Sequence, residues 1–368
     1  MKINIEEKQK LLNGELAIKL GNLNVKKIVE TFVGNSIGGY SMINTIKPTI
    51  LRNTSINEMM ESQGIEVELH NFSRSQNNSD EHLFEWLISN KKESEINKMN
   101  RNDYSGGPTS MPCDHFDQSK MDEYFPLNLE KDMGLRDIQE IKDPNTANLF
   151  VYCGCTGAWL DGVTRHGSLA QKFTPGVNWD LRGLEAFLKY THCSNRKNGT
   201  NTQIYVCGAP NLLGIHISGI INRRIKSVVK KYPHAVYVDP VIAKVFYNNS
   251  ITGKKGIDIH YNEEEYLKFN NNILQSFIDN YAIKKAMINV DRDVYNLSSD
   301  FELSGTEIFK EKDFVIDSLD KIIASQQFTS AKEELQFYKQ ALKFLTFRSP
   351  YDFCYVGKDN IKNVLTKK

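Results

Sequence analysis

Five short apolar segments constrain the fold of this chain most strongly. Each is rich in β-branched or aromatic residues, and most are apolar at successive positions rather than at alternate ones. A strand that is buried on both faces has this pattern, and such strands belong to parallel sheets that helices cover on both sides. The predicted strands are residues 27–34, 65–72, 148–155, 202–210 and 234–240.

Amphipathic helical patterns lie between these strands. In one of them Leu184, Phe187 and Leu188 fall on a single helical face. Strands that alternate with helices predict right-handed βαβ units, and therefore an α/β fold with a parallel sheet. The three clearest helical segments are residues 79–92, 179–192 and 218–232.

The chain has 368 residues, which is enough for one large domain or two ordinary ones. We expect an α/β domain over residues 1–300 with a large polar insertion at about 76–147, and a helical C-terminal extension over residues 301–368 packed on the core. In the extension, Ser330 and Glu333 have the spacing of a capping box. The apolar positions that follow step by three and four: Leu335, Tyr338, Leu342 and Leu345.

Composition excludes several classes of function. Lys and Arg number 46 against 45 Asp and Glu, so the net charge of +1 provides no long-range attraction for nucleic acid or an anionic membrane. The first residues are too polar for a signal peptide, and no apolar run is long enough for a membrane span. We therefore expect a cytoplasmic protein, whose six cysteines do not form a disulfide framework.

Candidate catalytic residues follow the first and the last predicted strands. Ser36 comes directly after the first strand, in "GNSIGGYSM", and ligands of open parallel sheets bind beyond the carboxyl ends of the strands. A nucleophilic serine needs a base, usually a histidine that a carboxylate orients. Asp258 and His260 follow the fifth strand in "GIDIHYNEEEYLKF". There Asn262 and Glu265 have capping-box spacing, which we expect to hold the preceding loop rigidly at one edge of the sheet.

These segments together resemble the SGNH (GDSL-type) hydrolases. The resemblance covers roughly residues 27–275 and rests on "FVGNSIGGY", on the alternation of strands and helices, and on "DIHYNEEEYLKF". It implies a three-layer α/β/α sandwich with a flavodoxin-like parallel sheet. It also implies that Ser36 is the nucleophile, His260 the general base and Asp258 the residue that orients the base. Members of that family are mostly esterases, lipases, carbohydrate acetylesterases and O-acyltransferases.

The sequence departs from the family pattern at the groups that bind the oxyanion. The first motif is usually Gly-Asp-Ser and here is Gly-Asn-Ser; the glycine expected after the second strand and the Gly-x-Asn-Asp expected after the third are missing. The main-chain amide of Ser36 remains as one donor, and loss of a donor typically lowers turnover about a hundred- to a thousandfold. The candidate replacements are Gln76, Asn77, Asn78, Thr156, Gly157 and Asn211, the last of which lies one strand too late.

The resulting expectation is hydrolysis of an acyl ester through an acyl-enzyme on Ser36, by an esterase or a carbohydrate deacetylase. Two alternatives stay open: an O-acyltransferase that acts on a sugar or metabolite hydroxyl, and a non-catalytic binding protein on a decayed hydrolase scaffold. The substrate is expected to be a small-molecule or carbohydrate ester, and an oligomer is compatible with the sequence. Acyl transfer of this kind requires no metal and no organic cofactor, so neither is expected. The acidic segment from Cys113 to Asp122 offers potential metal ligands but matches no standard zinc spacing.

Overall fold

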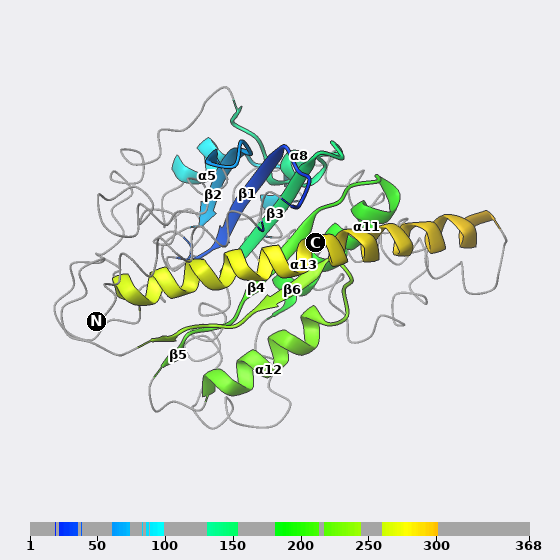
Figure 1. Cartoon of the computed structure of the whole chain (residues 1–368). Coiled ribbons are helices and arrows are strands. Elements are labelled where there is room, and N and C mark those ends of the chain that lie inside the picture. The colour runs from blue at the N-terminus through cyan, green and yellow to red at the C-terminus, as the bar shows by residue number, and fades with distance from the viewer. Residues whose placement is uncertain are drawn as a thin grey trace, which may run out of the picture.

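The computed structural model describes residues 22–35, 61–73, 89–98, 131–153, 181–212, 217–243 and 260–300, together with Lys19, Gly38, Leu83, Trp86 and Leu87. Its main strands are β1 (Lys27–Gly34), β2 (Glu66–Ser73), β3 (Thr146–Cys153), β4 (Gln203–Cys207) and β6 (Ala235–Val238). Two short strands, β5 (Asn211–Leu212) and β7 (Ile242–Ala243), pair with each other. The helices are α5 (Glu93–Lys98), α8 (Leu135–Gln139), α11 (Arg182–Lys197), α12 (Ile217–Val229) and α13 (Glu263–Asp300), as Figure 1 shows.

The five main strands form one parallel sheet in the order β2-β1-β3-β4-β6, which confirms the predicted α/β fold. In chain order of the strands this is 2-1-3-4-5, the order of flavodoxin-like sheets. β1 pairs along its whole length with both neighbours, and Gly34 at its carboxyl end lies level with Ser73 of β2 and Cys153 of β3. The carboxyl ends of these three strands therefore form one edge.

The predicted fourth strand is too long. It was expected to reach Pro210, whereas β4 ends at Cys207. The side chain of Asn222 on α12 explains the break, because its Oδ1 accepts a hydrogen bond from the Ala209 amide at 2.8 Å and its Nδ2 donates to the Ala209 carbonyl at 3.0 Å. Once both main-chain groups of Ala209 bond to α12, that residue no longer takes part in the ladder with β6.

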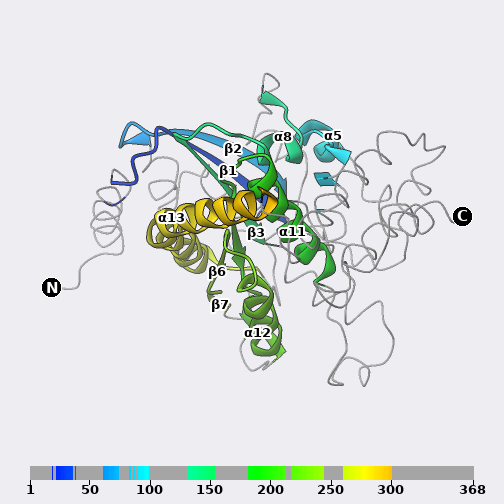
Figure 2. The ribbon, with the colours of Figure 1, turned by 90° about the vertical axis from the view of Figure 1, so that its right-hand side faces the viewer.

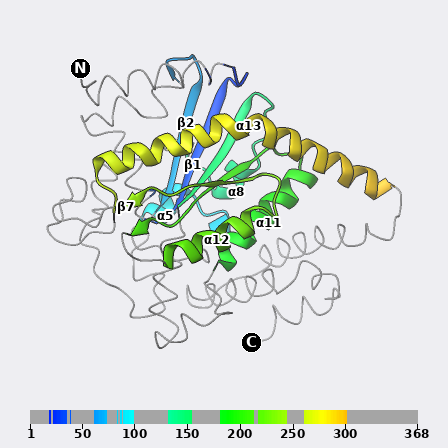
Figure 3. The same cartoon turned by 60° about the horizontal axis from the view of Figure 1, so that its bottom comes forward.

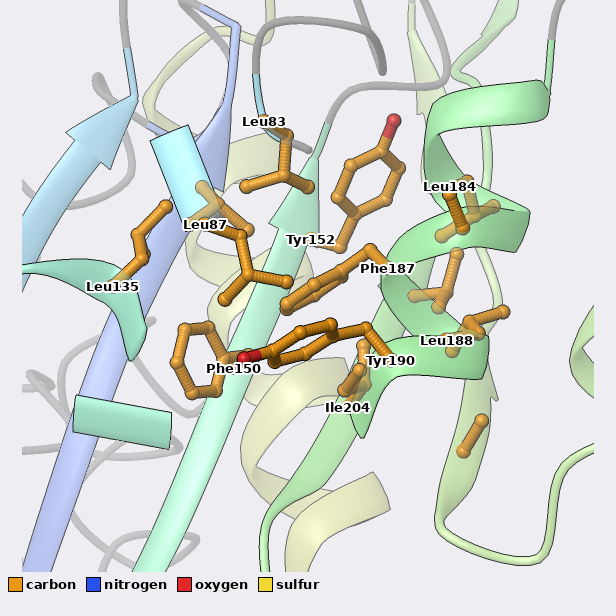
Figure 4. Packing of buried hydrophobic residues seen from close by; sticks show 14 of the residues in the cluster. Leu83, Leu87, Leu135, Phe150, Tyr152, Leu184, Phe187, Leu188, Tyr190 and Ile204 are labelled. Carbon is orange, nitrogen blue, oxygen red and sulfur yellow. The ribbon is translucent and has the colours of Figure 1, made fainter. Parts of the chain in front are cut away.

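Helices cover both faces of the sheet (Figure 2). α13 lies on one face, and α5, α8, α11 and α12 lie on the other. On the second face, Phe150 of β3 meets Phe187 of α11 edge to face at 5.4 Å, and Leu184 and Leu188 pack beside them (Figure 4). The predicted helices at 179–192 and 218–232 are thus confirmed as α11 and α12. Of the one predicted at 79–92, Leu83, Trp86, Leu87 and residues 89–92 are described: the first three are helical and buried in the same core, and Ser89 is helical. The prediction runs too far, because Asn90 has a φ of 54° and Lys92 pairs with Gly134 in a β-bridge.

α13 crosses the first face of the sheet and runs from the carboxyl end of β6 toward the amino end of β4 (Figure 3). Near its start Asn272 donates to the carbonyl of Asp239, which follows β6. Farther along, the carbonyl of Tyr281 accepts a hydrogen bond at 3.0 Å from Gln203, the first residue of β4. The helix therefore begins at the carboxyl edge of the sheet and passes beyond the amino edge. None of the described helices is long and apolar enough to cross a membrane.

The predicted division into a domain over residues 1–300 and an extension over 301–368 remains a prediction. Residues 301–368 and most of the insertion at 76–147 lie outside the described residues. The part of the insertion that is described contains α5 and α8, and both pack their apolar residues into the core beside α11.

One carboxyl group is buried within the sheet. Glu30 of β1 is 2% exposed and lies in register between Leu69 and Leu149, on the face that α13 covers. Its Oε1 has no hydrogen-bond partner among the described residues. Burial raises the pKa of this carboxyl to about 8, because no neighbouring charge replaces the water lost on folding.

The variant Glu30→Gln is expected to be more stable than the wild type at pH 8.5, and the gain is expected to vanish near pH 4. The folded state holds the proton up to about pH 8, whereas the unfolded chain releases it near the ordinary value of 4.5, so wild-type stability falls as pH rises between those values. Urea denaturation measures the difference, which is on the order of a few kcal/mol at the upper end. Glu61→Gln, at an exposed site, is the control, and a pH-independent gain would contradict the assignment.

Candidate functional site

The carboxyl edge of the sheet is built around the end of β1. Gly34 has a φ of 130°, a conformation that residues with a Cβ rarely adopt, so the chain turns sharply at this glycine. Asn35, which follows, is buried and donates its amide to the carbonyl of Cys153. The chain thus leaves β1 over the end of β3, one residue before Ser36.

Gly38 approaches the ends of the two neighbouring strands closely. A Cβ at this position would lie 2.8 Å from Ser73 Oγ and 3.1 Å from Cys153 Cβ, so an alanine does not fit without movement. Ser73 is 1% exposed, and its hydroxyl has no hydrogen-bond partner in the part of the chain that the structure describes. Gly38, two residues after Ser36, therefore lies close to the ends of β2 and β3 and next to the buried hydroxyl of Ser73.

His260 lies immediately before the capped start of α13. The predicted capping box is confirmed: the Glu265 amide donates to Asn262 Oδ1 at 2.9 Å, and the Asn262 amide donates to Glu265 Oε2 at 3.0 Å. These reciprocal bonds satisfy main-chain donors that the first turn of a helix leaves unpaired. They fix the entry of the chain into the helix, and His260, two residues earlier, is buried with 4% exposure.

Tyr261 locates this entry relative to the sheet. Its ring is completely buried, packs against Tyr266 and Phe269, and its hydroxyl donates to the carbonyl of Val241 at 3.4 Å. Burial raises the pKa of Tyr261, and the nearby thiols of Cys207 and Cys153 raise it further. Since Val241 follows the carboxyl end of β6, and Tyr261 shares a buried cluster with Cys153 and Cys207 at the ends of β3 and β4, the residue that follows His260 lies at the carboxyl edge of the sheet.

The structure thus brings His260, Gly38 and Ser73 to one edge of the sheet. Ser36 and Asp258, the other two residues of the predicted triad, lie outside the described residues. So do most of the predicted oxyanion donors: Gln76, Asn77, Asn78, Thr156 and Gly157. The main chain of Asn211 lies in β5, beyond the end of β4, which agrees with its expected place one strand too late. Of the predicted buried cysteines, Cys153 and Cys207 are confirmed, and Cys155 is not described.

Sequence reasoning missed Ser73 as a residue of this edge. The predicted second strand ends at Phe72, and the expected donors lie in the loop beyond it. The available signal was the pairing of strands, because a serine that lies level with Gly34 in the neighbouring strand must end at the same edge. That register depends on contacts across the sheet, which the spacing of apolar residues does not specify.

A second group of titratable side chains surrounds His70 of β2. The ring donates from Nε2 to Glu68 at 2.9 Å and from Nδ1 to Glu93 of α5 at 3.0 Å, and the residue is 2% exposed. Burial alone would lower the pKa of His70, but these two hydrogen bonds outweigh it and raise the pKa to about 9. Lys27 and Lys131 complete the charge balance at Glu68. The cluster ties edge strand β2 to α5; the His70 ring at its centre is buried, whereas the two lysines reach the solvent.

Metal ligation is not favoured by the described residues. No group of three or more His, Cys, Asp or Glu side chains among them is arranged to hold a metal ion. The segment from Cys113 to Asp122, which was expected to be a solvated acidic loop, lies outside the described residues.

Replacement of Gly38 by alanine is expected to destabilise the protein by about 1–3 kcal/mol, the usual effect of overpacking. The new methyl group would meet the Ser73 hydroxyl and the Cys153 side chain. Ser73→Ala removes the closer of these atoms, so Gly38→Ala is expected to be less destabilising in that background. Chemical denaturation of the wild type, both single variants and the double variant measures this coupling. Strictly additive effects would contradict the close contact between Gly38 and Ser73.

The stabilising effect of His70 is expected to disappear at high pH. Its folded pKa of about 9 exceeds the ordinary 6.5, so its contribution is complete below pH 6.5 and is lost as pH rises through about 9. The stability difference between the wild type and His70→Gln should therefore shrink by on the order of 2 kcal/mol between pH 6 and pH 9.5. Urea titrations at these two values measure it, and a constant difference would mean that the buried ring is neutral.

Comparisons with known proteins found no match. No family model matches the chain, and neither does any curated protein or solved structure. What stands is the fold, a five-stranded parallel sheet with helices on both faces. The functional assignment depends on the residues at the carboxyl edge of this sheet.

Proposed function

We propose that the protein is a serine hydrolase that cleaves an acyl ester through an acyl-enzyme on Ser36. His260 acts as the general base and Asp258 orients it. The substrate is a small-molecule or carbohydrate ester, and the chemistry requires neither a metal nor an organic cofactor. The finer assignment to the SGNH (GDSL-type) hydrolases belongs to this proposal and rests on the sequence motifs.

The observation that carries the proposal is the place of His260. The reciprocal bonds of Asn262 and Glu265 fix the entry to α13, and the hydrogen bond from Tyr261 to Val241 holds this entry beside the segment that follows β6. β1 ends at the same edge, at Gly34, two residues before Ser36. Ligands of open parallel sheets bind beyond this edge, so a hydroxyl that follows β1 and an imidazole before the last helix suit one crevice.

The proposed mechanism is acyl transfer in two steps. His260 takes the proton from Ser36, whose oxygen attacks the ester carbonyl and forms a tetrahedral intermediate. His260 then returns the proton to the departing alkoxide, which leaves an acyl group on Ser36. Water activated by His260 attacks this acyl-enzyme, the carboxylic acid leaves, and the proton passes back to Ser36.

The Ser73 hydroxyl is a candidate donor to the oxyanion, besides the amide of Ser36. It is buried, it has no hydrogen-bond partner among the described residues, and it lies against Gly38 two residues after the nucleophile. A preorganised donor of this kind stabilises charge that develops in the transition state without a cost of reorientation. Ser73 thereby joins Gln76, Asn77, Asn78, Thr156 and Gly157 as a candidate for the missing glycine and asparagine.

A non-catalytic binding role is the second candidate, and the burial of His260 favours it. A ring that is 4% exposed has little access to a substrate unless the residues around it move. The O-acyltransferase alternative shares every step up to the acyl-enzyme and differs only in the acceptor, a sugar hydroxyl in place of water.

Fluorophosphonate labelling of the purified protein tests the nucleophile. We expect one adduct by intact mass, located at Ser36 by peptide mapping, and turnover of at least one member of a panel of acyl esters. Ser36→Ala should lose the adduct and reduce turnover by about a thousandfold or more, and His260→Gln should reduce turnover to a similar degree. Ser41→Ala, in the same segment, is the matched control, and thermal melts confirm that each variant folds.

The same assay distinguishes a hydrolase, which transfers the acyl group to water, from a transferase and from a binding protein without activity. A sugar alcohol that diverts the acyl group from water in proportion to its concentration identifies a transferase. A folded wild type that is neither labelled nor active on the whole panel overturns the enzymatic proposal and leaves a binding protein.

A further inference from the structure

The outer half of α13 carries two apolar faces, and within the part of the chain that the structure describes only one of them is buried. Tyr281 and Ile288 point inward and are 3% and 2% exposed. On the opposite side Ile283, Met287 and Val290 are 60%, 42% and 62% exposed. They are three of the four large apolar side chains that are exposed among the described residues, and they are gathered on one helix.

The exposed apolar residues follow a heptad spacing. Ile283, Met287 and Val290, which we call the outer stripe, are separated by four and then three residues. Val294 and Leu297 continue this spacing in the sequence, which extends the pattern over about 20 Å of helix. Such a period describes a straight seam of the kind that packs against a second helix. In Figures 1 and 3 this part of α13 extends past the end of the sheet.

Charges of opposite sign lie on the two sides of the outer stripe. With Met287 at position a of a heptad and Ile283 at position d, Asp279 falls at position g and Lys284 at position e. Asp279 is exposed and Lys284 is half-buried. In a parallel pair of helices the g side of one faces the e side of the other, so an acidic residue of each copy would meet a basic residue of the other.

The charges disfavour an antiparallel pair. In that arrangement each side of the seam faces the same side of the second copy. The g side carries two exposed aspartates, Asp279 and Asp293, and the residue between them at this position is Ala286. The e side carries Lys284 and Asp291. The carboxylate of Asp291 is already held by Arg196 of its own chain, so it is not available to pair with Lys284 of the second copy. The outer stripe is therefore complementary to a second copy of itself in the parallel direction.

We propose that the outer stripe is a dimerisation surface, on which α13 of a second copy packs in parallel about a twofold axis that runs along the two helices. Ile283, Met287 and Val290 of each copy then meet their counterparts across the axis. Asp279 of each copy faces Lys284 of the other, and the symmetry repeats this pair. Such an interface is isologous and closes after two copies.

The contacts between α13 and the rest of the described chain leave the three side chains of the outer stripe exposed. The helix is anchored near the amino edge of its own sheet by a bidentate pair, in which Arg196 donates to Asp291 with both distances at 2.6 Å, and by Arg292, which donates to the carbonyl of Asn195 at 2.9 Å. Arg292 lies on the inner side of the helix, whereas Asp291 borders the outer stripe at position e, so Arg196 of the same chain flanks the stripe on that side.

The size of the surface sets the strength of the expected dimer. Two helices in contact over about 20 Å bury less than a stable interface usually requires, so we expect weak, reversible association. Sedimentation velocity of the full chain from about 1 to 200 µM tests this, and we expect dissociation in the micromolar range.

A charge placed in the outer stripe tests the surface. Met287→Glu should abolish association, because it brings two carboxylates together at the centre of the seam. Asn289→Glu, an exposed position off the stripe, is the matched control and should associate like the wild type. Thermal melts are expected to show no loss of stability in either variant, since both sites are on the surface.

A charge exchange tests the direction of the helices. Asp279→Lys alone and Lys284→Glu alone should each weaken self-association at least about tenfold, since each brings like charges together twice. An equimolar mixture of the two variants should associate as well as the wild type. In the mixed dimer Asp279 of one copy meets Lys284 of the other, and the two introduced charges meet each other.

Three results would overturn the proposal. The first is a wild type that stays monomeric over the whole range. The second is an Asp279→Lys variant that associates normally, which would place another surface or an antiparallel arrangement at the contact. The third is a Met287→Glu variant that is a destabilised monomer, as expected if residues 301–368 of the same chain cover the stripe.

Discussion

The parallel sheet has to be covered on both faces, and the rest of the structure follows from this constraint. β1, β3 and β4 are almost entirely buried, and side chains alternate between the two faces along each of them. Phe150 points to α11, whereas Leu149 and Val151 belong to the cluster under α13. Two helical layers are therefore obligatory, and the helices that supply them must connect the carboxyl edge to the amino edge.

The same constraint places the candidate site. Each connection leaves the sheet at its carboxyl edge, so Gly34 and Ser73 converge there even though 38 residues separate them in the chain. α13 has to begin at that edge to cover the face from one end to the other, and its capping box sets where the helix starts. The burial of the position before the cap is thus a consequence of covering the sheet. That the residue at this position is a histidine, and that it acts as a base, belongs to the proposed function.

α13 is longer than is needed to cover its own sheet, and it carries more apolar side chains than that sheet buries. It has 38 residues, and its inner side is satisfied by the sheet and by the bond between Arg196 and Asp291 near the amino edge. The apolar side chains on its outer side do not contribute to that packing. Apolar surface of this kind on one rigid element usually marks an interaction site, which connects the length of α13 to assembly rather than to folding.

The sequence alone determined the five parallel strands, α11, α12 and the capping box at Asn262, because each depends on residues close together in the chain. Local spacing specifies burial on one face or two, and a cap requires only an amide and a carboxyl three residues apart. Only the tertiary structure decided where β4 ends, how closely Gly38 approaches Ser73 and that His70 lies between two carboxylates. These features depend on contacts between segments that are distant in sequence, whose register and distance no local pattern encodes.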